Sequence, residues 1–450
     1  MAMVVKNNMS AVNTLNILNK NQSALAKSLQ KVSSGMKINS AGDDASGYAI
    51  SERMRVQIRS LDQDNQNTQN GNSMMRTAEG AVSSTVEILK TLKEKAINAA
   101  NDTNTDEDRR TIQKEINQMV DQIDDNALAT YNGKYLVDGS RNAKGDATCT
   151  TLTNNALSTA SKWSSALTDL KSRTDESLNI QSTDNVTVSY VRQGRTYTTT
   201  FSVGTNGLSD IIKSTAFNGT ESLAGTALVS GTKNEALVGL DKAKNSVYTA
   251  DNKTALSINA AGTGTTYQVS SFTISITDNT GAIRKTANTA LDAFNERIRA
   301  ENESDDNALV LQTGVKANQA IKVSMTDMRS LALGVKGTDG QVLSVQTQEK
   351  ANAAINTLET ALQKALDEQA NIGAIQSRLN YTSTNLTTAS ENVQNSESTI
   401  RDADMAKEMT NYTKNNVLLQ AAQSMLAQAN QTSSAVLSLL QEFASAVTYG

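Results

Sequence analysis

The sequence predicts a mainly α-helical protein with an inserted β-rich module. Three observations lead to this prediction. None of the 450 residues is proline, so nothing in the chain forces a helix to bend or end. Apolar residues recur every seven positions toward both chain ends, which is the pattern of helices that pair along their length. The middle of the chain is instead rich in Thr, Ser and Gly, and in places alternates apolar with polar residues, as β-strands do.

The first forty residues predict a helix that lacks a core of its own. Leu18, Leu25 and Val32 recur at intervals of seven, and Leu29 lies beside them. This stretch carries five lysines, and no acidic residue occurs before Asp43. Because a single apolar stripe must pack against another element, we expect this helix to pair with one from elsewhere in the chain.

Two more helices are expected between residues 41 and 144. Ser40 and Asp43, three residues apart, offer a capping arrangement for the first. The segment 101–110, NDTNTDEDRR, separates the two helices and supplies caps and acidic first-turn residues for the second. The apolar seams comprise Met75, Ala78, Val82, Leu89, Leu92, Ala96 and Ala99 in the first helix, and Ile112, Ile116, Met119 and Ile123 in the second.

Residues 145–300 predict an exposed, mainly β insert. The clearest signal is NVTVSYVRQGRTYTTTFSV, in which two strand-like runs flank Gln193-Gly194 and predict a hairpin. The segment beginning at Phe272 is interpreted in the same way, with a turn near residues 279–281. Trp163 is expected to anchor the insert's core, and Cys149 to be a small structural thiol. Because every bundle seam lies outside 145–300, we expect the bundle not to depend on the insert.

The C-terminal part continues the helical pattern. Leu379, Leu386, Val393 and Ile400 are spaced by seven, and a small residue follows each by three, which favours a close helix pair. We therefore expect Leu386 and Val393 to be the centre of the bundle's stability.

Residues 415–441 then carry no charge over 27 positions, which is the length of a membrane span. The amide side chains within this stretch, among them Gln420, Gln423 and Asn430, make insertion into hydrocarbon unfavourable, so we expect no membrane insertion. Instead, Leu426, Leu437 and Leu440 can pack against the first helix. An isolated pair of such helices would be marginal, and an assembly of many copies is the alternative that orders them.

Composition argues against several functional classes. The net charge of −4 and the absence of a basic, aromatic-interleaved stripe argue against nucleic-acid binding. The chain contains no His, so the usual general base and the usual metal ligand are both missing, and we expect no enzyme activity, metal or cofactor. The single Cys permits no intramolecular disulfide.

Residues 29–61, LQKVSSGMKINSAGDDASGYAISERMRVQIRSL, closely resemble the N-terminal signature of bacterial flagellins. The resemblance continues through residues 77–124 and 131–140, and through the C-terminal segments from residue 309 onward. It implies a long coiled-coil-like bundle formed by both chain ends and a small β-hairpin near 308–325. The terminal stretch of the family commonly contains Pro, whereas this chain has ANQTSSAV there. The family usually ends at the position of Gln441, whereas nine more residues follow Gln441 here.

The resemblance also implies how the chain is divided into domains. Residues 1–40 and 405–450 would be axial core helices, 41–144 and 301–404 a helical bundle domain, and 145–300 a variable outer insert. The residues expected to carry self-assembly and core packing are Leu18, Leu25, Leu29, Val32, Leu379, Leu386, Val393, Ile400, Leu426, Leu437 and Leu440.

In function, the resemblance implies a structural subunit that polymerises into the extracellular flagellar filament for motility. It implies unfolded export through the flagellar type III apparatus, with an export chaperone and the hook-associated junction and cap proteins as partners. A hook–filament junction protein and a coiled-coil surface adhesin are the alternatives.

Some flagellins are recognised by Toll-like receptor 5 through a stretch that resembles residues 89–101 here, together with a Glu that matches Glu115. Leu89 is present, but Thr91 stands where that stretch has Arg, and Lys95 where it has Leu. Arg can pair bidentately with acceptors, and a charge is unfavourable in a packed interface. We therefore expect weak receptor activation.

Overall fold

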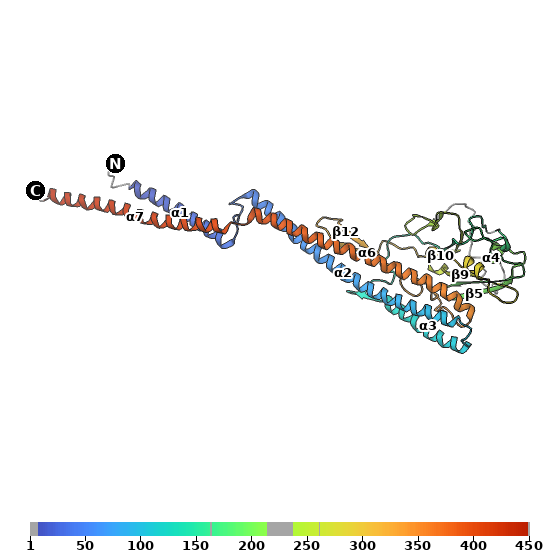
Figure 1. Ribbon diagram of the computed structural model, residues 1–450. Helices are drawn as coiled ribbons and strands as arrows, with labels where there is room; N and C mark the ends of the chain where they lie inside the picture. Colours follow the sequence, from blue (N-terminus) through green and yellow to red (C-terminus); the bar gives the residue numbers. More distant parts are fainter. Residues whose placement is uncertain (1–7, 163, 214–236, 261, 449–450) are drawn as a thin grey trace. The chain divides into compact units, whose positions relative to one another are not determined.

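The chain folds into long helices from both ends and small sheets from the middle, which confirms the predicted fold class (Figure 1). The computed structural model describes residues 8–162, 164–213, 237–260 and 262–448. The expected anchor Trp163 lies outside the described residues. The chain divides into two compact units: the first comprises Met1–Gln66, Gly314–Ala317 and Ser383–Gly450, and the second Asn67–Thr313 and Asn318–Thr382.

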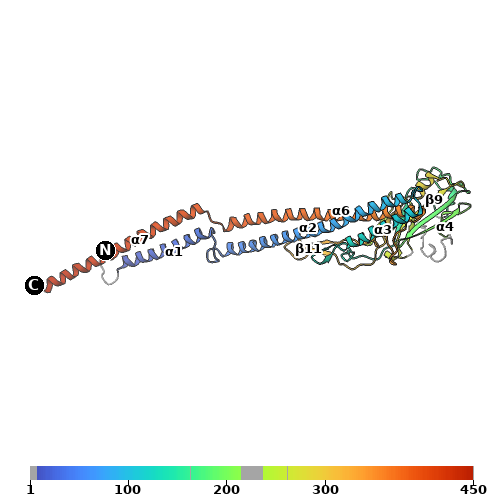
Figure 2. The same ribbon diagram turned by 90° about the horizontal axis from the view of Figure 1, so that it is seen from below.

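In the first unit, helices α1 (Met9–Ser34) and α7 (Met405–Thr448) run side by side, as both ribbon views show (Figures 1 and 2). Helix α1 ends at Gly35, whose positive φ of 71° is a left-handed conformation that glycine adopts without strain.

Helix α2 (Ala45–Ala99) begins ten residues later, and its cap differs from the prediction. Asp44 accepts hydrogen bonds from the backbone N–H groups of Ser46 (3.1 Å) and Gly47 (3.0 Å). The carboxylate of Asp43 instead closes the preceding loop, since it accepts from the N–H and hydroxyl of Ser40. The proposed Ser40–Asp43 pair therefore exists but does not cap α2, because the helix starts one residue after Asp44.

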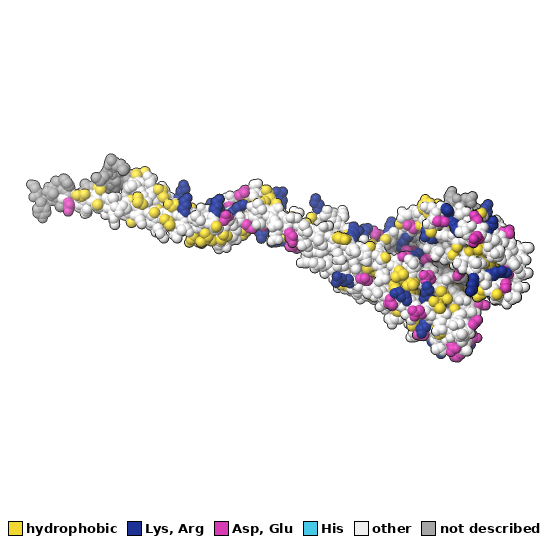
Figure 3. Space-filling model, in the orientation of Figure 1, with side chains coloured by type: hydrophobic (Ala, Val, Ile, Leu, Met, Phe, Trp, Pro, Cys, Tyr) yellow, Lys and Arg dark blue, Asp and Glu magenta, His cyan; other side chains and the backbone are white. Residues whose placement is uncertain are grey.

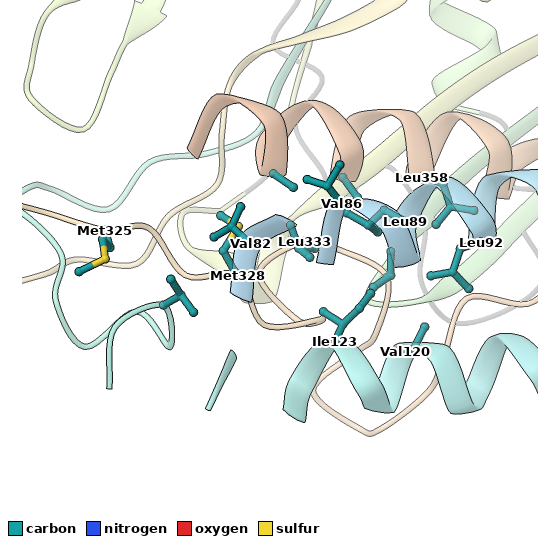
Figure 4. Packing of buried hydrophobic residues seen from close by; sticks show 14 of the residues in the cluster. Val82, Val86, Leu89, Leu92, Val120, Ile123, Met325, Met328, Leu333 and Leu358 are labelled. Carbon is teal, nitrogen blue, oxygen red and sulfur yellow. The ribbon is translucent and has the colours of Figure 1, made fainter. Parts of the chain in front are cut away.

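The second unit contains a three-helix core built from α2, α3 (Asp106–Ala127) and α6 (Gln348–Arg401). A capping box between Thr105 and Asp108 starts α3, as the acidic segment predicted. Side chains from all three helices meet in the cluster of Figure 4. The predicted seam on α2 is confirmed, because all seven of its residues are fully buried: Met75, Ala78, Val82, Leu89, Leu92, Ala96 and Ala99.

The seam on α6 lies farther toward the N-terminus than predicted. Ala351, Leu358, Ala365, Ile372 and Leu379 are spaced by seven and all are buried in this core. The same series continues into the first unit, where Leu386 is 8% exposed and Val393 and Ile400 are half-buried. Burial is thus less complete at Leu386 and Val393 than at the earlier positions of the series, which argues against the expectation that these two residues are the centre of the bundle's stability.

The hairpin predicted near 308–325 is present. Strands β11 (Leu309–Gln312) and β12 (Ala320–Val323) pair antiparallel. Leu311 packs against α2 at Gly71, where an added Cβ would lie 2.6 Å from a Leu311 methyl carbon. A smaller hairpin joins β1 (Thr130–Tyr131) and β2 (Lys134–Tyr135).

The insert contains two three-stranded antiparallel sheets. One has the order β5-β4-β9 and the other β10-β3-β8. Their side chains and those of two short helices surround a separate apolar core that includes Leu167, Val188, Leu208 and Ile274. The remaining elements are a strand pair and two 3-10 turns. The bounds are β3 Thr151–Asn154, β4 Asn185–Arg192, β5 Arg195–Ser202, β6 Leu237–Leu240, β7 Ser246–Tyr248, β8 Leu256–Asn259, β9 Val269–Thr277, β10 Phe294–Ile298, α4 Leu208–Lys213, α5 Lys285–Leu291, η1 Leu167–Asp169 and η3 Thr265–Tyr267.

One of the two predicted hairpins is correct. Gln193 and Gly194 both adopt positive φ between β4 and β5, as a two-residue hairpin loop requires. The segment from Phe272 is not a hairpin. Its turn forms around Asp278, but the returning chain makes only the bridge between Thr277 and Ile283 and then enters α5. Strand β9 pairs with β4 instead.

The insert is packed against the bundle rather than appended to it. Val191 of β4 is fully buried within the bundle cluster. The Ser271 hydroxyl donates to the carbonyl of Ala353 on α6 at 3.2 Å, and the Thr357 hydroxyl donates to Ser271 at 2.9 Å. The helical seams lie outside 145–300 as expected, but the bundle also contacts residues of the insert, because the insert covers part of α6.

Candidate assembly surface

Polar side chains form hydrogen bonds between helices α1 and α7. The side-chain amide of Asn21 donates to the carbonyl of Leu418 at 3.3 Å, and that of Asn415 donates to the Ser28 hydroxyl at 3.1 Å. The Asn8 amide donates to a carbonyl near the other end of the contact. These contacts fix an antiparallel register between two segments about as far apart in sequence as the chain allows.

The pair encloses almost no apolar core. Among the described side chains of the two helices, only Ser28 and Ala422 are buried. Helix pairs in water gain most of their stability from burying an apolar face. The pair therefore lacks the burial that would make it stable by itself.

The two helices instead carry many large apolar side chains on their surfaces, visible as yellow patches along this part of the molecule (Figure 3). Exposure reaches 63% for Met9 and 62% for Met425. A soluble monomer rarely exposes so large an apolar surface unless a partner covers it. The exposed residues are Met9, Val12, Leu15, Ile17 and Leu29 on α1, and Met405, Met409, Val417, Leu418, Met425, Leu437 and Leu439 on α7.

The residues predicted to carry assembly at the chain ends fall into two groups. Leu18, Leu25, Val32 and Leu426 are half-buried in the first unit. Leu29 and Leu437 are exposed, and the side chain of Leu440 lies outside the described residues. The first group can hold α1 against α7, whereas the second is free to meet another copy of the chain.

An arginine that sequence reasoning did not single out fixes the loops at the base of this pair. The side chain of Arg401 is 7% exposed and donates to Glu52 at 2.7 Å and to the Met36 sulfur at 3.0 Å. Its guanidinium also lies 5.5 Å from the ring centre of Tyr48. The hydrogen bond from Arg401 to Glu52 is the largest of the influences that lower the pKa of the Glu52 carboxyl. Arg401 thus ties the end of α6 to the loop after α1 and to the start of α2.

The stretch proposed for receptor contact lies on α2 and α3 in the second unit. Leu89 is fully buried in the core, so its side chain is not available to a receptor, and its assignment as a contact residue is corrected. Thr91 is half-buried, and its hydroxyl donates to the carbonyl of Glu87. Lys95 forms an ion pair with Glu115, with 2.9 Å between nitrogen and oxygen. The two charged residues therefore neutralise each other.

In the described part of the chain, no group of three or more His, Cys, Asp or Glu side chains is placed to bind a metal ion. Among the same residues, no helix combines the length and apolarity needed to cross a bilayer.

The family models and the curated relatives point to one family. Residues 5–142 match the bacterial flagellin N-terminal helical region, and residues 355–440 match the bacterial flagellin C-terminal helical region. The chain is 35% identical to a flagellin of Clostridium tyrobutyricum, over 95% of this chain and 99% of that protein. It is 29% identical to a flagellin of Bacillus subtilis (strain 168), over 98% and 100% of the two chains.

The chain is also 29% identical to a flagellar filament 33 kDa core protein of Treponema phagedenis, over 98% of this chain and 100% of that protein. Among solved structures, FliC from Burkholderia pseudomallei matches with 18% identity and a TM-score of 0.25, over 68% and 99% of the two chains.

Proposed function

The chain belongs to the bacterial flagellin family and is a structural subunit of a flagellar filament, and we propose that it polymerises through the exposed apolar faces of α1 and α7. The observation that carries the proposal is that these two helices expose far more apolar surface than they bury. They expose twelve large apolar side chains, five on α1 and seven on α7, yet bury only Ser28 and Ala422 among their described residues. Packing many copies together would supply the missing burial, because each subunit would cover the apolar faces of its neighbours.

We propose the following division of the chain. Residues 1–40 and 405–450 form the axial core, 41–144 and 301–404 the bundle domain, and 145–300 the outer insert. The separate apolar cores of the bundle and the insert support this division, as does the absence of a core between α1 and α7. Assembly would be heterologous, with each subunit joining its neighbours through unlike surfaces, so that the polymer stays open-ended.

Export in an unfolded state and placement outside the cell are part of the same proposal. A chain with one Cys and no Pro forms no intramolecular disulfide and avoids slow proline isomerisation on refolding. An export chaperone and the junction and cap proteins are the proposed partners, since the apolar faces of α1 and α7 need cover before polymerisation.

Purified chain, with no other flagellar component, is expected to polymerise into long filaments. Electron microscopy after seeding or salting out would detect them. A junction protein would give short oligomers or monomers under the same conditions, and an adhesin would remain soluble. Either of these two outcomes would overturn the filament role. The junction role is the less supported one, because the chain covers curated flagellins over nearly their whole length.

We also propose that Toll-like receptor 5 recognises the chain only weakly. The half-buried Thr91 has no guanidinium group to offer a receptor, and the carboxylate of Glu115 is already in an ion pair with Lys95. The double substitution Thr91→Arg with Lys95→Leu is therefore expected to raise potency in a receptor-reporter assay, by about tenfold or more if one charge-assisted bond is gained.

The single substitution Lys90→Arg, on the same turn, serves as the control because it keeps the charge and the pairing partner Glu87. Potency that does not rise in the double variant, or that rises equally in the control, would refute the assignment of this stretch.

A further inference from the structure

A group of charged side chains lies where the insert meets α6, and it has no part in the assembly surface. Lys364 and Glu368, one turn apart on α6, are 5% and 3% exposed. Glu296 of β10, whose side chain is 6% exposed, and the partly exposed Arg299 face them from the insert. Ionised side chains that are buried in this way destabilise a fold unless their charges compensate one another.

The contacts within this group are uneven. Lys364 lies 3.5 Å from Glu296, and Arg299 lies 3.8 Å from the other oxygen of Glu296 and also pairs with Asp367. Glu368 contacts neither cation directly. One of its oxygens accepts a hydrogen bond from the Thr326 hydroxyl at 2.8 Å, and the other is buried without a hydrogen-bond partner.

Counting charges shows that one carboxyl is in excess. The group holds two cations, Lys364 and Arg299, and three carboxyls, Glu296, Asp367 and Glu368. Two further ion pairs line the adjoining space: Lys242 with Glu301 at 2.7 Å, and Arg329 with Asp327 at 2.6 Å. The carboxyls of Glu303 and Asp305 line it as well and add no positive charge. If all three carboxyls ionised, one negative charge would remain without compensation in a buried site, and Glu368 is the carboxyl with the fewest favourable contacts.

A cavity adjoins the group. It has a volume of about 350 Å³ and is lined by residues of the insert, by the segment after β12 and by α6, including Arg299, Thr326 and Lys364. Packing between these three elements is therefore incomplete at the point where the excess charge would appear, so they have space to separate.

We propose that Glu368 is a proton-dependent latch for the insert. In its protonated form it lets residues 294–301 and 324–328 stay packed on α6. In its ionised form it loosens that packing, while the three-helix core of the second unit remains intact.

The direction of the pH dependence follows from the burial of Glu368. Burial raises the pKa of this carboxyl from 4.5 to about 7, and hydrogen bonding to Thr326 and the charge of Arg299 oppose the rise only in part. The protonated form therefore stabilises the packing fully below pH 4.5, and this contribution is lost as the pH rises through about 7.

The neighbouring ion pair titrates as well. Burial raises the pKa of Glu296 and lowers that of Lys364. Lowering the pKa of a lysine removes stability as the pH falls, which is opposite to the effect of Glu368. The contribution of Glu368 to the stability of the packing can therefore be distinguished from that of Lys364 only by comparing variants at each pH.

Hydrogen exchange of the full chain, measured by mass spectrometry between about pH 5 and pH 8, tests the latch against the variant Glu368→Gln. Gln is nearly isosteric, remains neutral and can still accept from Thr326. At any one pH the intrinsic exchange rates cancel in the ratio of wild type to variant. For peptides from 294–301 this ratio is expected to rise by about tenfold or more across the range, since each unit of pKa shift corresponds to a tenfold factor. The ratio for peptides from α3 should stay constant.

Two further variants separate the latch from general destabilisation. Asp367→Asn removes the partly exposed carboxyl that pairs with Arg299 but leaves Glu368 buried and ionisable, so the pH dependence of the wild type should remain. Glu349→Gln, which changes an exposed carboxyl on the same helix, should leave the wild-type profile unchanged. A ratio for Glu368→Gln that stays constant with pH, or that rises equally in α3, would overturn the proposal.

Discussion

Removal of both terminal helices, residues 1–34 and 405–450, is expected to abolish filament formation completely. The remaining chain keeps the three-helix core, because no residue of that core lies in the deleted segments. It loses all twelve exposed apolar side chains of α1 and α7. We therefore expect a folded monomer whose main thermal transition matches that of the full chain and which forms no polymer in sedimentation or electron microscopy.

Point variants of the full chain sharpen this test. Val12→Thr combined with Met425→Gln replaces two exposed apolar side chains by polar ones of similar shape. Full burial of one such side chain contributes about 1.5–3 kcal/mol, so losing even half of this at two sites should raise the critical concentration for polymerisation by about tenfold or more. The monomer should be unaffected, because both side chains already face water.

Lys20→Gln, which alters an exposed polar position on α1, is the matched control and should polymerise normally. Filaments formed by the truncated chain would show that the lattice rests on the bundle or the insert. An unchanged critical concentration for the double variant would show that Val12 and Met425 lie outside the contacts between subunits.

The α2 seam could be predicted from the sequence because bulky residues mark its heptad positions. Met75, Val82, Leu89 and Leu92 stand out against polar neighbours, and each is buried. Local turn chemistry was equally informative at Gln193-Gly194, where two positive φ angles are needed. The same local reasoning misplaced the segment after Phe272, since a turn specifies a reversal of the chain but not whether a strand or a helix follows.

The centre of the α6 seam was misplaced for a compositional reason. Two of its five buried positions, Ala351 and Ala365, are alanines, which do not stand out in an Ala-rich helix. The bulkier residues near Leu386 are more conspicuous in the sequence. In the first unit, however, they meet only the N-terminal part of α2, through contacts such as Ser383 to Asn65, whereas the second unit adds α3 and the chain after β12.

Contacts between distant segments left no pattern that could be recognised in the sequence. Ser271 and Thr357 are common residues 86 positions apart, yet they join the insert to α6. The same is true of Arg401 and Glu52, and of Lys364 and Glu296. A single polar residue shows its partner only after the fold has brought the two together, because its energy depends on burial and geometry rather than on spacing.

Leu358→Ala is expected to be the most destabilising of the single core substitutions considered on α6, with a loss of about 2–5 kcal/mol in the free energy of unfolding. Leu358 is 2% exposed, and it lies among the side chains of α2 and α3 in the cluster of Figure 4. Removing its three outer carbons leaves a cavity that neighbours on three helices cannot fill, because each is already packed against another. Equilibrium urea unfolding, followed by far-UV circular dichroism, measures the loss.

Leu386→Ala is the matched control, since it makes the same chemical change at an equivalent heptad position of the same helix. Leu386 is 8% exposed and has fewer packed neighbours, so its site can collapse or admit water, and the loss should be clearly smaller than at Leu358. Equal losses would mean that the helix pair of the first unit is as tightly packed as the three-helix core. A larger loss at Leu386 would restore the position that the heptad pattern alone had favoured.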